Sequence, residues 1–273
     1  MNTLYLVATP IGNLEDLSRR AERILRESTL IAAEDTRVTG KLLAHFKIST
    51  PQTSYYEHNK ASKLDRILAA LERGDVALVS DAGTPGINDP GYELVSAALA
   101  AGYEVSPIPG ASAPIAALVA SGLPTDSFLY FGYLPRKGKE RREKLQEVAN
   151  QPYTLIFLES PHRVLKALDD IEKVLGNRKI AVARELTKMY EEFFRGDVAE
   201  ARDHFDAHAP RGEFTLVVAG KKQDNAKWTE ASLNSTIETG IAAGESPSAL
   251  AKRLAKESGW ARRDVYNLIS LIK

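Results

Sequence analysis

The sequence predicts an α/β protein built from two α/β domains, with a small helical region near its C-terminal end. Short apolar runs alternate with amphipathic stretches through both halves of the 273-residue chain, which is the pattern of strands alternating with helices. Several of these runs end in loops rich in glycine, proline or polar residues, and ligands bind at such strand ends in open α/β sheets. A chain of this length can also bury the cores of two ordinary domains.

The composition restricts the chemistry that the chain can perform. Lys plus Arg and Asp plus Glu number 36 each, so zero formal charge argues against binding nucleic acid by bulk charge, while a local basic patch stays open. Cysteine is absent, which excludes disulfides, thiolate nucleophiles and zinc–thiolate sites, and the candidate residues include no metal ligand. Because no apolar run reaches about 18 residues, and Met1 is not followed by a basic region and a long apolar stretch, we expect a cytoplasmic protein without a membrane partner.

The first half is predicted to alternate four strands with five helices. The predicted strands are 4–8, 30–33, 76–80 and 103–108, and the predicted helices are 17–25, 38–46, 64–71, 92–100 and 115–121. Asn13 or Asp16 is expected to cap the first helix. The stretch 34-EDTR-37, at a strand end, is either a polar site or a salt-bridged helix start, and 53–59 is a polar segment.

A glycine-rich stretch, 80-SDAGTPGINDPG-91, follows the strand that begins at Val76. Three glycines and two prolines within nine residues allow left-handed turns and let a ligand approach bare backbone. An ordinary strand-to-helix connection is the alternative, but such a connection needs only about two to six residues. We therefore expect this loop to form one wall of a binding site.

The second half is predicted to begin after the connection 122–127, with mixed strand pairing allowed. Its predicted strands are 128–133, 153–158, 179–183 and 214–219, with a helix through 164–171. The stretch 135-PRKGKERREK-144 is either a solvated helix start or a mobile basic flap over RNA. The expected domains are residues 1–121, 125–222 and 236–273.

The C-terminal region is predicted to hold two short helices joined at Gly259. Residues 223–235 are polar and are expected to form a linker, and Pro247 suits the first turn of the helix that follows. Lys252, Arg253 and Lys256, with Arg262 and Arg263, lie on or beside these helices. The pair is either a helix-turn-helix that binds RNA or a plain helical hairpin packed on the body or on a partner subunit.

Seven motifs, in order along nearly the whole chain, carry a resemblance to a known family. They are 8-ATPIGNLEDLS-18, 33-AEDTR-37, 80-SDAGTPGINDPG-91, 109-PGASA-113, 159-ESPHR-163, 184-RELTK-188 and 211-RGEFTLVVAG-220. Together they resemble the tetrapyrrole-methylase superfamily of S-adenosylmethionine-dependent methyltransferases. The second and fifth motifs are similar to its ribosomal RNA branch rather than to its corrin branch. In agreement, neither a Gly-x-Gly-x-x-Gly dinucleotide motif after the first strand nor a Gly-x-x-x-x-Gly-Lys-Ser/Thr motif occurs.

The resemblance implies a homodimer of two-domain subunits that holds S-adenosylmethionine in the cleft between its domains and leaves S-adenosylhomocysteine. Its implied reaction is methylation of the ribose 2'-hydroxyl of a cytidine in the decoding region of 16S ribosomal RNA, within the 30S subunit. The implied cofactor-binding residues are Pro10, Asp81, Gly83, Thr84, Ile87, Ser112, Ala113, Leu158, Glu213 and Thr215.

Transfer of a methyl group to a ribose oxygen needs in-line alignment and a group that accepts the proton or stabilises the alkoxide. The catalytic candidates are Asp35, Arg37, Glu159 and Lys188, and we expect Asp35 or Glu159 to lie closest to the transferred methyl group. The histidines at 58 and 162 are either catalytic or structural. The candidates for binding RNA are Arg136, Lys137, Arg141, Arg163, Arg262 and Arg263.

Two other classes of function stay open on the sequence. One is a C-methyltransferase for a corrin or porphyrin precursor, for which the basic stretch 136–144 would be dispensable. The other is a non-catalytic ribosome-assembly factor that binds through the basic stretch and the helical region, with steeply salt-dependent association.

Overall fold

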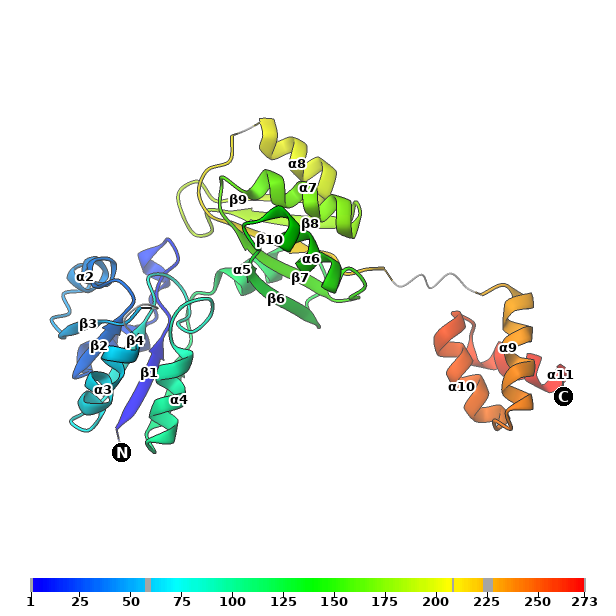
Figure 1. The fold of residues 1–273 in the computed structure, drawn as a ribbon, viewed down its shortest axis with the longest axis horizontal. Coiled ribbons are helices and arrows are strands. Elements are labelled where there is room, and N and C mark those ends of the chain that lie inside the picture. The colour runs from blue at the N-terminus through cyan, green and yellow to red at the C-terminus, as the bar shows by residue number, and fades with distance from the viewer. Residues whose placement is uncertain (1, 57–59, 208, 223–227, 273) are drawn as a thin grey trace. The chain divides into compact units, whose positions relative to one another are not determined.

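The computed structural model describes residues 2–56, 60–207, 209–222 and 228–272, and it confirms the predicted α/β class (Figure 1). Residues 1–221 pack as one compact unit and residues 222–273 as a second, and each is described by itself. The first unit contains two five-stranded sheets. Among the described helices, none is long and apolar enough to cross a membrane.

The first sheet is parallel throughout, with the strand order β3-β2-β4-β1-β5. Its strands are β1 (Thr3–Val7), β2 (Leu30–Ala33), β3 (Gln52–Ser54), β4 (Val76–Val79) and β5 (Glu104–Ile108). All four residues of β2 and of β4 are buried, because helices cover both faces of the sheet. Sequence analysis missed β3, which has three polar residues at the sheet edge and only one buried position.

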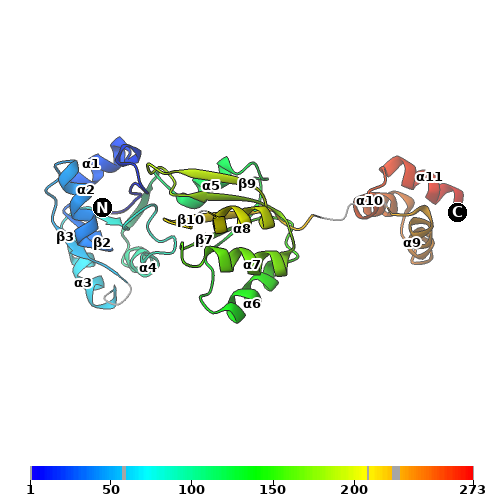
Figure 2. The same ribbon diagram turned by 90° about the horizontal axis from the view of Figure 1, so that it is seen from above.

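Helices on both faces build two cores around the first sheet. The helices of this part are the 3-10 helix η1 (Leu14–Asp16), α1 (Arg19–Glu27), α2 (Thr36–His45), α3 (Lys60–Leu71) and α4 (Tyr92–Ala100). One core joins α1 and α2 to the sheet through Leu25 and Leu43, and the other joins α3 and α4 through Leu71 and Leu94 (Figure 2).

The cap predicted for the first helix was wrong. Asn13 caps η1, where its side chain accepts the N–H of Glu15, and Asp16 lies inside η1. Ser18 caps α1 by accepting the N–H of Ala21 at 3.0 Å. The sequence did not predict η1, and the predicted helix began two residues early, at Leu17, because Leu17 shares the helical spacing of the apolar positions in α1.

The second sheet is mixed, with the order β6-β7-β10-β8-β9. Its strands are β6 (Phe128–Tyr133), β7 (Thr154–Glu159), β8 (Lys179–Arg184), β9 (Glu192–Asp197) and β10 (Phe214–Val218). Only β6 and β7 are parallel, and the other pairs are antiparallel. This confirms that mixed pairing occurs in the second half.

Four helices cover this mixed sheet. They are α5 (Ala113–Ala120), α6 (Gly138–Val148), α7 (Val164–Leu175) and α8 (Val198–Ala207). The helices α6, α7 and α8 share one core, whose largest side chains include Phe157 and Phe205. On the other face, α5 packs through Ala117 and Leu118, although it precedes every strand of this sheet in sequence.

The edge strand β9 and the helix α8 were not predicted from the sequence, in which no element was assigned between residues 183 and 214. The strand has no fully buried residue and carries Glu192 and Asp197 at its ends. An edge strand buries too little to need a continuous apolar run. Its pairing with β8 along six residues is decided by tertiary contact.

The second unit is a bundle of three helices: α9 (Glu230–Ala242), α10 (Pro247–Ser258) and α11 (Arg262–Ile272). The sequence predicted two of them and placed the first six residues of α9 in a linker, 223–235, of which residues 223–227 lie outside the described part of the chain. Polar residues dominate α9, but Leu233 and Ile237 are fully buried against α10 and α11. Gly259 ends α10 in the left-handed conformation, with φ 68°.

Candidate active site

The parallel first sheet brings the carboxyl ends of β1, β2 and β4 to one edge, and the motif loops follow these ends. A two-way backbone bridge fastens two of the loops together: the N–H of Thr9 donates to the carbonyl of Gly83 at 2.9 Å, and the N–H of Gly83 donates back at 3.0 Å. Asp35, after β2, donates its N–H to Asp81, after β4, at 3.0 Å. Loops that are far apart in sequence thus form one polar surface.

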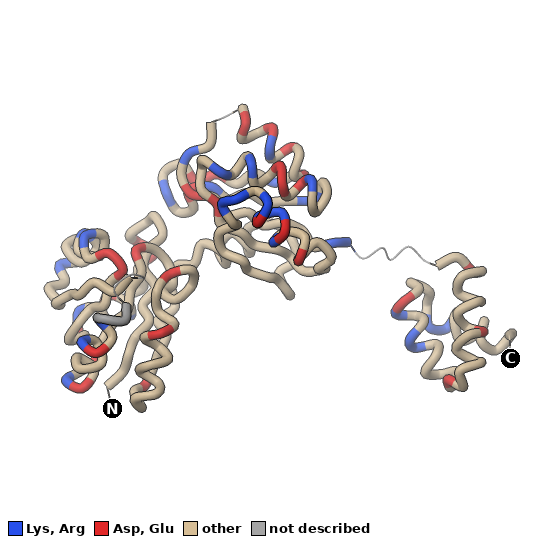
Figure 3. The backbone as a smooth tube through the Cα atoms, in the orientation of Figure 1, with Lys and Arg blue, Asp and Glu red and all other residues tan. Residues whose placement is uncertain are grey.

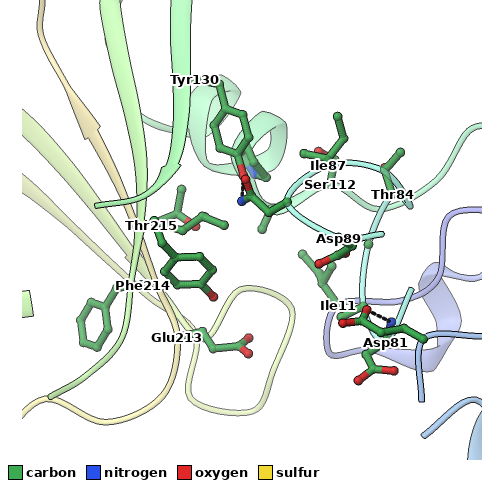
Figure 4. Close-up of a pocket in the computed structure, with 18 residues that line it drawn as sticks. Ile11, Asp81, Thr84, Ile87, Asp89, Ser112, Tyr130, Glu213, Phe214 and Thr215 are labelled. Atoms are coloured by element: carbon green, nitrogen blue, oxygen red, sulfur yellow. Dashed lines mark hydrogen bonds between the residues drawn. The ribbon is translucent and has the colours of Figure 1, made fainter. Parts of the chain in front are cut away.

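The first cavity, of about 380 Å³, lies between this surface and the end of the second sheet (Figure 4). Nine of the ten residues predicted to bind a cofactor line it: Asp81, Gly83, Thr84, Ile87, Ser112, Ala113, Leu158, Glu213 and Thr215. Pro10 lines an adjoining second cavity instead. The sequence motifs therefore converge in space, as one binding site requires.

Strand register decides which second-sheet side chains reach the first cavity. Leu158 on β7 is paired with Thr215 on β10, so both side chains point to the face that α5 covers. Glu159 is paired with Phe214 one position on, and these two point to the opposite face. Accordingly, Figure 4 shows Thr215 directed toward the cavity and the ring of Phe214 directed away from it.

Bare backbone forms part of the cavity wall. Gly83 and Gly86 have φ of 84° and 83°, in the left-handed region that other residues rarely adopt. Gly83 lines the cavity, whereas Gly86 does not; a Cβ atom added at Gly86 would meet no atom within 4 Å, so this part of the turn is exposed rather than packed. The glycine-rich stretch therefore has the open backbone that its sequence predicts.

Two tyrosines and Asn88 complete the wall, and sequence analysis did not include them among the cofactor-binding residues. Asn88 donates from its amide to the Tyr130 hydroxyl, across the space between the two sheets. Gly132 permits this approach, because a Cβ atom there would lie 2.3 Å from the Asn88 side-chain oxygen. Burial raises the pKa of Tyr130 to about 12 and also raises that of Tyr133, so both stay neutral hydroxyls. Of these three residues, only Asn88 belongs to one of the seven sequence motifs, and that position was the one sign in the sequence that it forms part of the cavity wall.

Three carboxylates, Glu34, Asp81 and Asp89, give the cavity an acidic side. Burial raises the pKa of each, and the negative charges of its neighbours raise the pKa of Glu34 and Asp89 further. Glu34 is fixed by accepting the N–H of Asp81 at 3.2 Å. Grouped, partly desolvated carboxylates favour a cationic ligand, which would relieve their mutual repulsion.

The second cavity, of about 350 Å³, adjoins the first and shares Ile11, Asp81, Ala82 and Glu213 with it. Lys188 lines it and bonds to Glu185 at 2.8 Å and to Glu213 at 3.0 Å. Burial alone would lower the pKa of Lys188, but the bonds to these two carboxylates raise it overall. Lys188 is therefore positively charged and fixed by two carboxylates at the boundary of the two cavities.

The other three predicted catalytic residues line neither cavity. Asp35 caps α2 and forms an ion pair with Arg37 at 2.6 Å, and the hydrogen bonds from Arg37 lower the Asp35 pKa to about 2. Glu159 is 1% exposed on the other face of its sheet and bonds to Arg163 at 3.1 Å. Arg163 in turn donates to the carbonyl of Leu134, next to Tyr133. The geometry therefore gives Glu159 and Arg163 a supporting position behind the wall.

The predicted RNA-binding arginines and lysines differ in exposure. Arg141 is 5% exposed and bonds to Asp170 at 2.7 Å, so it holds α6 to α7 and offers no surface to RNA. Its apolar stem and charge are both used in the core, which a basic stretch in sequence does not reveal. The other candidates Arg136, Lys137, Arg262 and Arg263 are exposed.

The two histidine candidates do not enter the site. His162 is exposed after β7, and His58 lies outside the described residues. Among the residues that the structure describes, no group of three or more acidic, histidine or cysteine side chains is placed to hold a metal ion.

Comparison with known families adds a match over residues 3–202, to the model described as Tetrapyrrole (Corrin/Porphyrin) Methylases. A Synechocystis protein named Ribosomal RNA small subunit methyltransferase I is 49% identical over 98% of this chain and 97% of its own length. Proteins of the same name from Halalkalibacterium halodurans and Bacillus subtilis are 50% and 42% identical, over 97% and 98% of this chain and 94% of each relative.

Solved structures share the fold at low sequence identity. The uroporphyrin-III-C-methyltransferase from Thermus thermophilus matches with a TM-score of 0.55 at 21% identity, over 80% of this chain and 94% of that one. A cobalt precorrin-4 methyltransferase matches with a TM-score of 0.61 at 16% identity, over the same shares. These likenesses support the fold of this chain.

Replacing Asp89 by Asn is expected to stabilise the ligand-free protein in a pH-dependent way. Because the native-state pKa of Asp89 lies above its unfolded-state value, the native state binds the proton more tightly, and the free energy of unfolding falls as pH rises through this range. The neutral amide of Asn does not titrate, so the variant does not lose this free energy. The difference in free energy of unfolding between Asp89→Asn and the wild type should therefore grow from pH 4 to pH 8. Urea unfolding at each pH measures it, with Asp126→Asn, an exposed position, as control. A gain that does not change with pH would contradict the burial argument.

Proposed function

Because the chain belongs to the tetrapyrrole (corrin/porphyrin) methylase family, we propose that it is an S-adenosylmethionine-dependent methyltransferase that modifies ribosomal RNA. The observation that carries the substrate class is the identity of 49% over almost the full length of a relative named for that substrate. More finely, we propose that the acceptor is the ribose 2'-hydroxyl of a cytidine in the decoding region of 16S ribosomal RNA, reached in the cytoplasm within the 30S subunit.

The residues of the first cavity fit S-adenosylmethionine, whose bound sulfonium supplies an already activated methyl group. Ile87, Leu158 and Ala113 provide apolar surface for an adenine ring, and Gly83 contributes bare backbone to the wall. The acidic side formed by Glu34, Asp81 and Asp89 complements the positive charges of the amino acid part. The volume of about 380 Å³ lies within the range of small-molecule sites.

An RNA substrate accounts for more of the chain than a corrin does. The family match ends at residue 202, before the helical unit, whereas the full-length relatives cover 97% to 98% of this chain. We propose that the helical unit contacts RNA through α11, where Arg262, Arg263, Tyr266 and Asn267 line a shallow hollow. Figure 3 shows Lys and Arg on α10 and near the start of α11. Guanidinium groups with an aromatic ring suit phosphates and unpaired bases.

The chain's own groups at the boundary of the two cavities are placed to handle the acceptor proton. Asp81 and Glu213 are the carboxylates shared by both cavities, so either can take a hydroxyl proton beside the bound cofactor. Lys188 holds Glu213 and, as a cation, stabilises negative charge that develops on the acceptor oxygen. In this proposal Asp35 and Arg37 orient Asp81 rather than touch the methyl group.

We also propose a homodimer. Exposed apolar side chains occur on α4, on α5 and on the strand that follows: Tyr92, Leu99, Ile115, Val119 and Phe128 are 38% to 77% exposed. Exposed apolar surface of this kind is a candidate for a subunit interface.

The decisive experiment measures labelled methyl transfer from S-adenosylmethionine to 30S subunits lacking the modification, to naked 16S RNA and to a corrin precursor. We expect label on the 30S subunit, recovered after digestion as 2'-O-methylcytidine. Label on the tetrapyrrole alone would make the chain a corrin or porphyrin methylase. Salt-dependent binding to the 30S subunit without transfer would make it an assembly factor.

Replacing Lys188 by Met is expected to lower methyl transfer at least about 100-fold, the scale of a lost acid–base or charge-stabilising group. Cofactor affinity, measured by calorimetry, should change less than about threefold, since Lys188 does not line the first cavity. Lys188→Arg should recover part of the rate, and Lys166→Met, an exposed position on α7, is the matched control. Unchanged transfer by Lys188→Met would remove Lys188 from the mechanism.

Replacing both Arg262 and Arg263 by Glu is expected to weaken binding to the 30S subunit and to make it less dependent on salt. Each lost phosphate contact lowers the slope of log affinity against log salt by about one unit. The matched control replaces Arg19 and Arg20, two adjacent exposed arginines at the start of α1, by Glu. Equal effects of the two double variants would refute a specific role for α11.

A further inference from the structure

The second cavity has a composition that the cofactor does not explain. Its volume of about 350 Å³ is close to that of the first, and it is formed by the loop 9–14, one side of α2, residues 80–82, and two residues of the second half. Val38, Lys41 and Leu42 follow the three- and four-residue spacing that places side chains on one face of a helix. One face of α2, from Val38 to Leu42, thus lines the second cavity.

The lining of the second cavity is apolar at one part and charged at another. Leu14 and Val38 are 38% and 39% exposed, and with Leu42 they offer apolar surface that the described chain leaves open. Charged groups are supplied by Lys41, and by Asp81, Lys188 and Glu213 at the boundary with the first cavity. An aromatic ring with polar substituents needs both kinds of surface.

Size and position together restrict the occupant. The first cavity, only slightly larger, has room for a ligand made of a nucleoside and an amino acid, so the second has room for one nucleoside. The shared residues Ile11, Asp81, Ala82 and Glu213 make the two cavities continuous. An acceptor atom at this boundary lies beside both the donor site and the proton-accepting carboxylates.

We propose that the second cavity receives the target nucleoside, turned out of the RNA, with its base against Leu14, Val38 and Leu42 and its ribose at the Asp81–Glu213 boundary. Enzymes that act on a nucleotide within folded nucleic acid commonly extrude it into such a pocket. Lys41, exposed on the same face of α2, meets the phosphate beside the extruded nucleoside. This inference rests on the proposed function and adds a separate acceptor site to it.

The test fills the second cavity without touching the first. Val38→Trp adds an indole from α2, and Leu14→Trp adds one from η1. The second variant therefore decides the test if the first fails to fold. Ala44→Trp adds the same ring to an exposed position of α2 that does not line the cavity, and it serves as the matched control. Each variant is assayed for methyl transfer to 30S subunits, for S-adenosylmethionine affinity by calorimetry and for thermal unfolding.

We expect transfer by Val38→Trp and Leu14→Trp to fall at least about 100-fold, with cofactor affinity within about twofold of the wild type. Ala44→Trp should stay within about twofold of the wild type in both methyl transfer and cofactor affinity. Normal transfer by both filled variants, or a matching loss of cofactor affinity, would overturn the acceptor site while leaving the proposed function in place. Wild-type protein that methylates only a tetrapyrrole would overturn the proposed function itself, and this inference with it.

Discussion

The site depends on the parallel order of the first sheet. Parallel strands have all their carboxyl ends at one edge, so the loops after β1, β2 and β4 meet without any further element to collect them. The two backbone hydrogen bonds between Thr9 and Gly83 then fasten two of these loops to each other. Everything that the site offers a ligand on this side, the open glycine turns and the carboxylates, is positioned by that edge.

The second sheet contributes through register rather than through loops alone. Leu158 and Thr215 reach the first cavity because they are paired on adjacent antiparallel strands, and the next pair, Glu159 and Phe214, must then face the opposite core. A buried carboxylate in that core is tolerated because Arg163 lies 3.1 Å away. One strand position therefore separates a residue of the cavity wall from a structural ion pair.

Charge is distributed unevenly around the two cavities. The first is lined by carboxylates whose pKa values are raised by burial, and the boundary with the second is held by Lys188 between Glu185 and Glu213. In the proposed reaction the cationic donor binds beside these carboxylates, and the acceptor, which becomes negative as it loses its proton, lies beside Lys188. Neutral overall charge conceals this arrangement, because the chain balances its charges across the whole sequence.

Much of the fold and of the first cavity could be predicted from the sequence. Periodicity located all the strands with continuous apolar runs, and the glycine-rich loop marked one wall of the site. Periodicity failed at β3, β9 and α9, where few residues are buried and partners distant in sequence supply the stabilising contacts. Arg141 was misjudged for a related reason, because a basic run does not show that one of its members pairs with Asp170 in a core.

By itself, the sequence determined the α/β class and the motif loops, since these depend on local patterns and residue types. Its resemblance to a known family pointed to ten further residues, nine of which line the first cavity. Only the tertiary structure decided that α5 packs on the second sheet, that Tyr130 and Asn88 meet across the site, and that Glu159 points away from it. The physical reason is that strand pairing and register join residues far apart in the chain. A shift of one position reverses which face a side chain occupies.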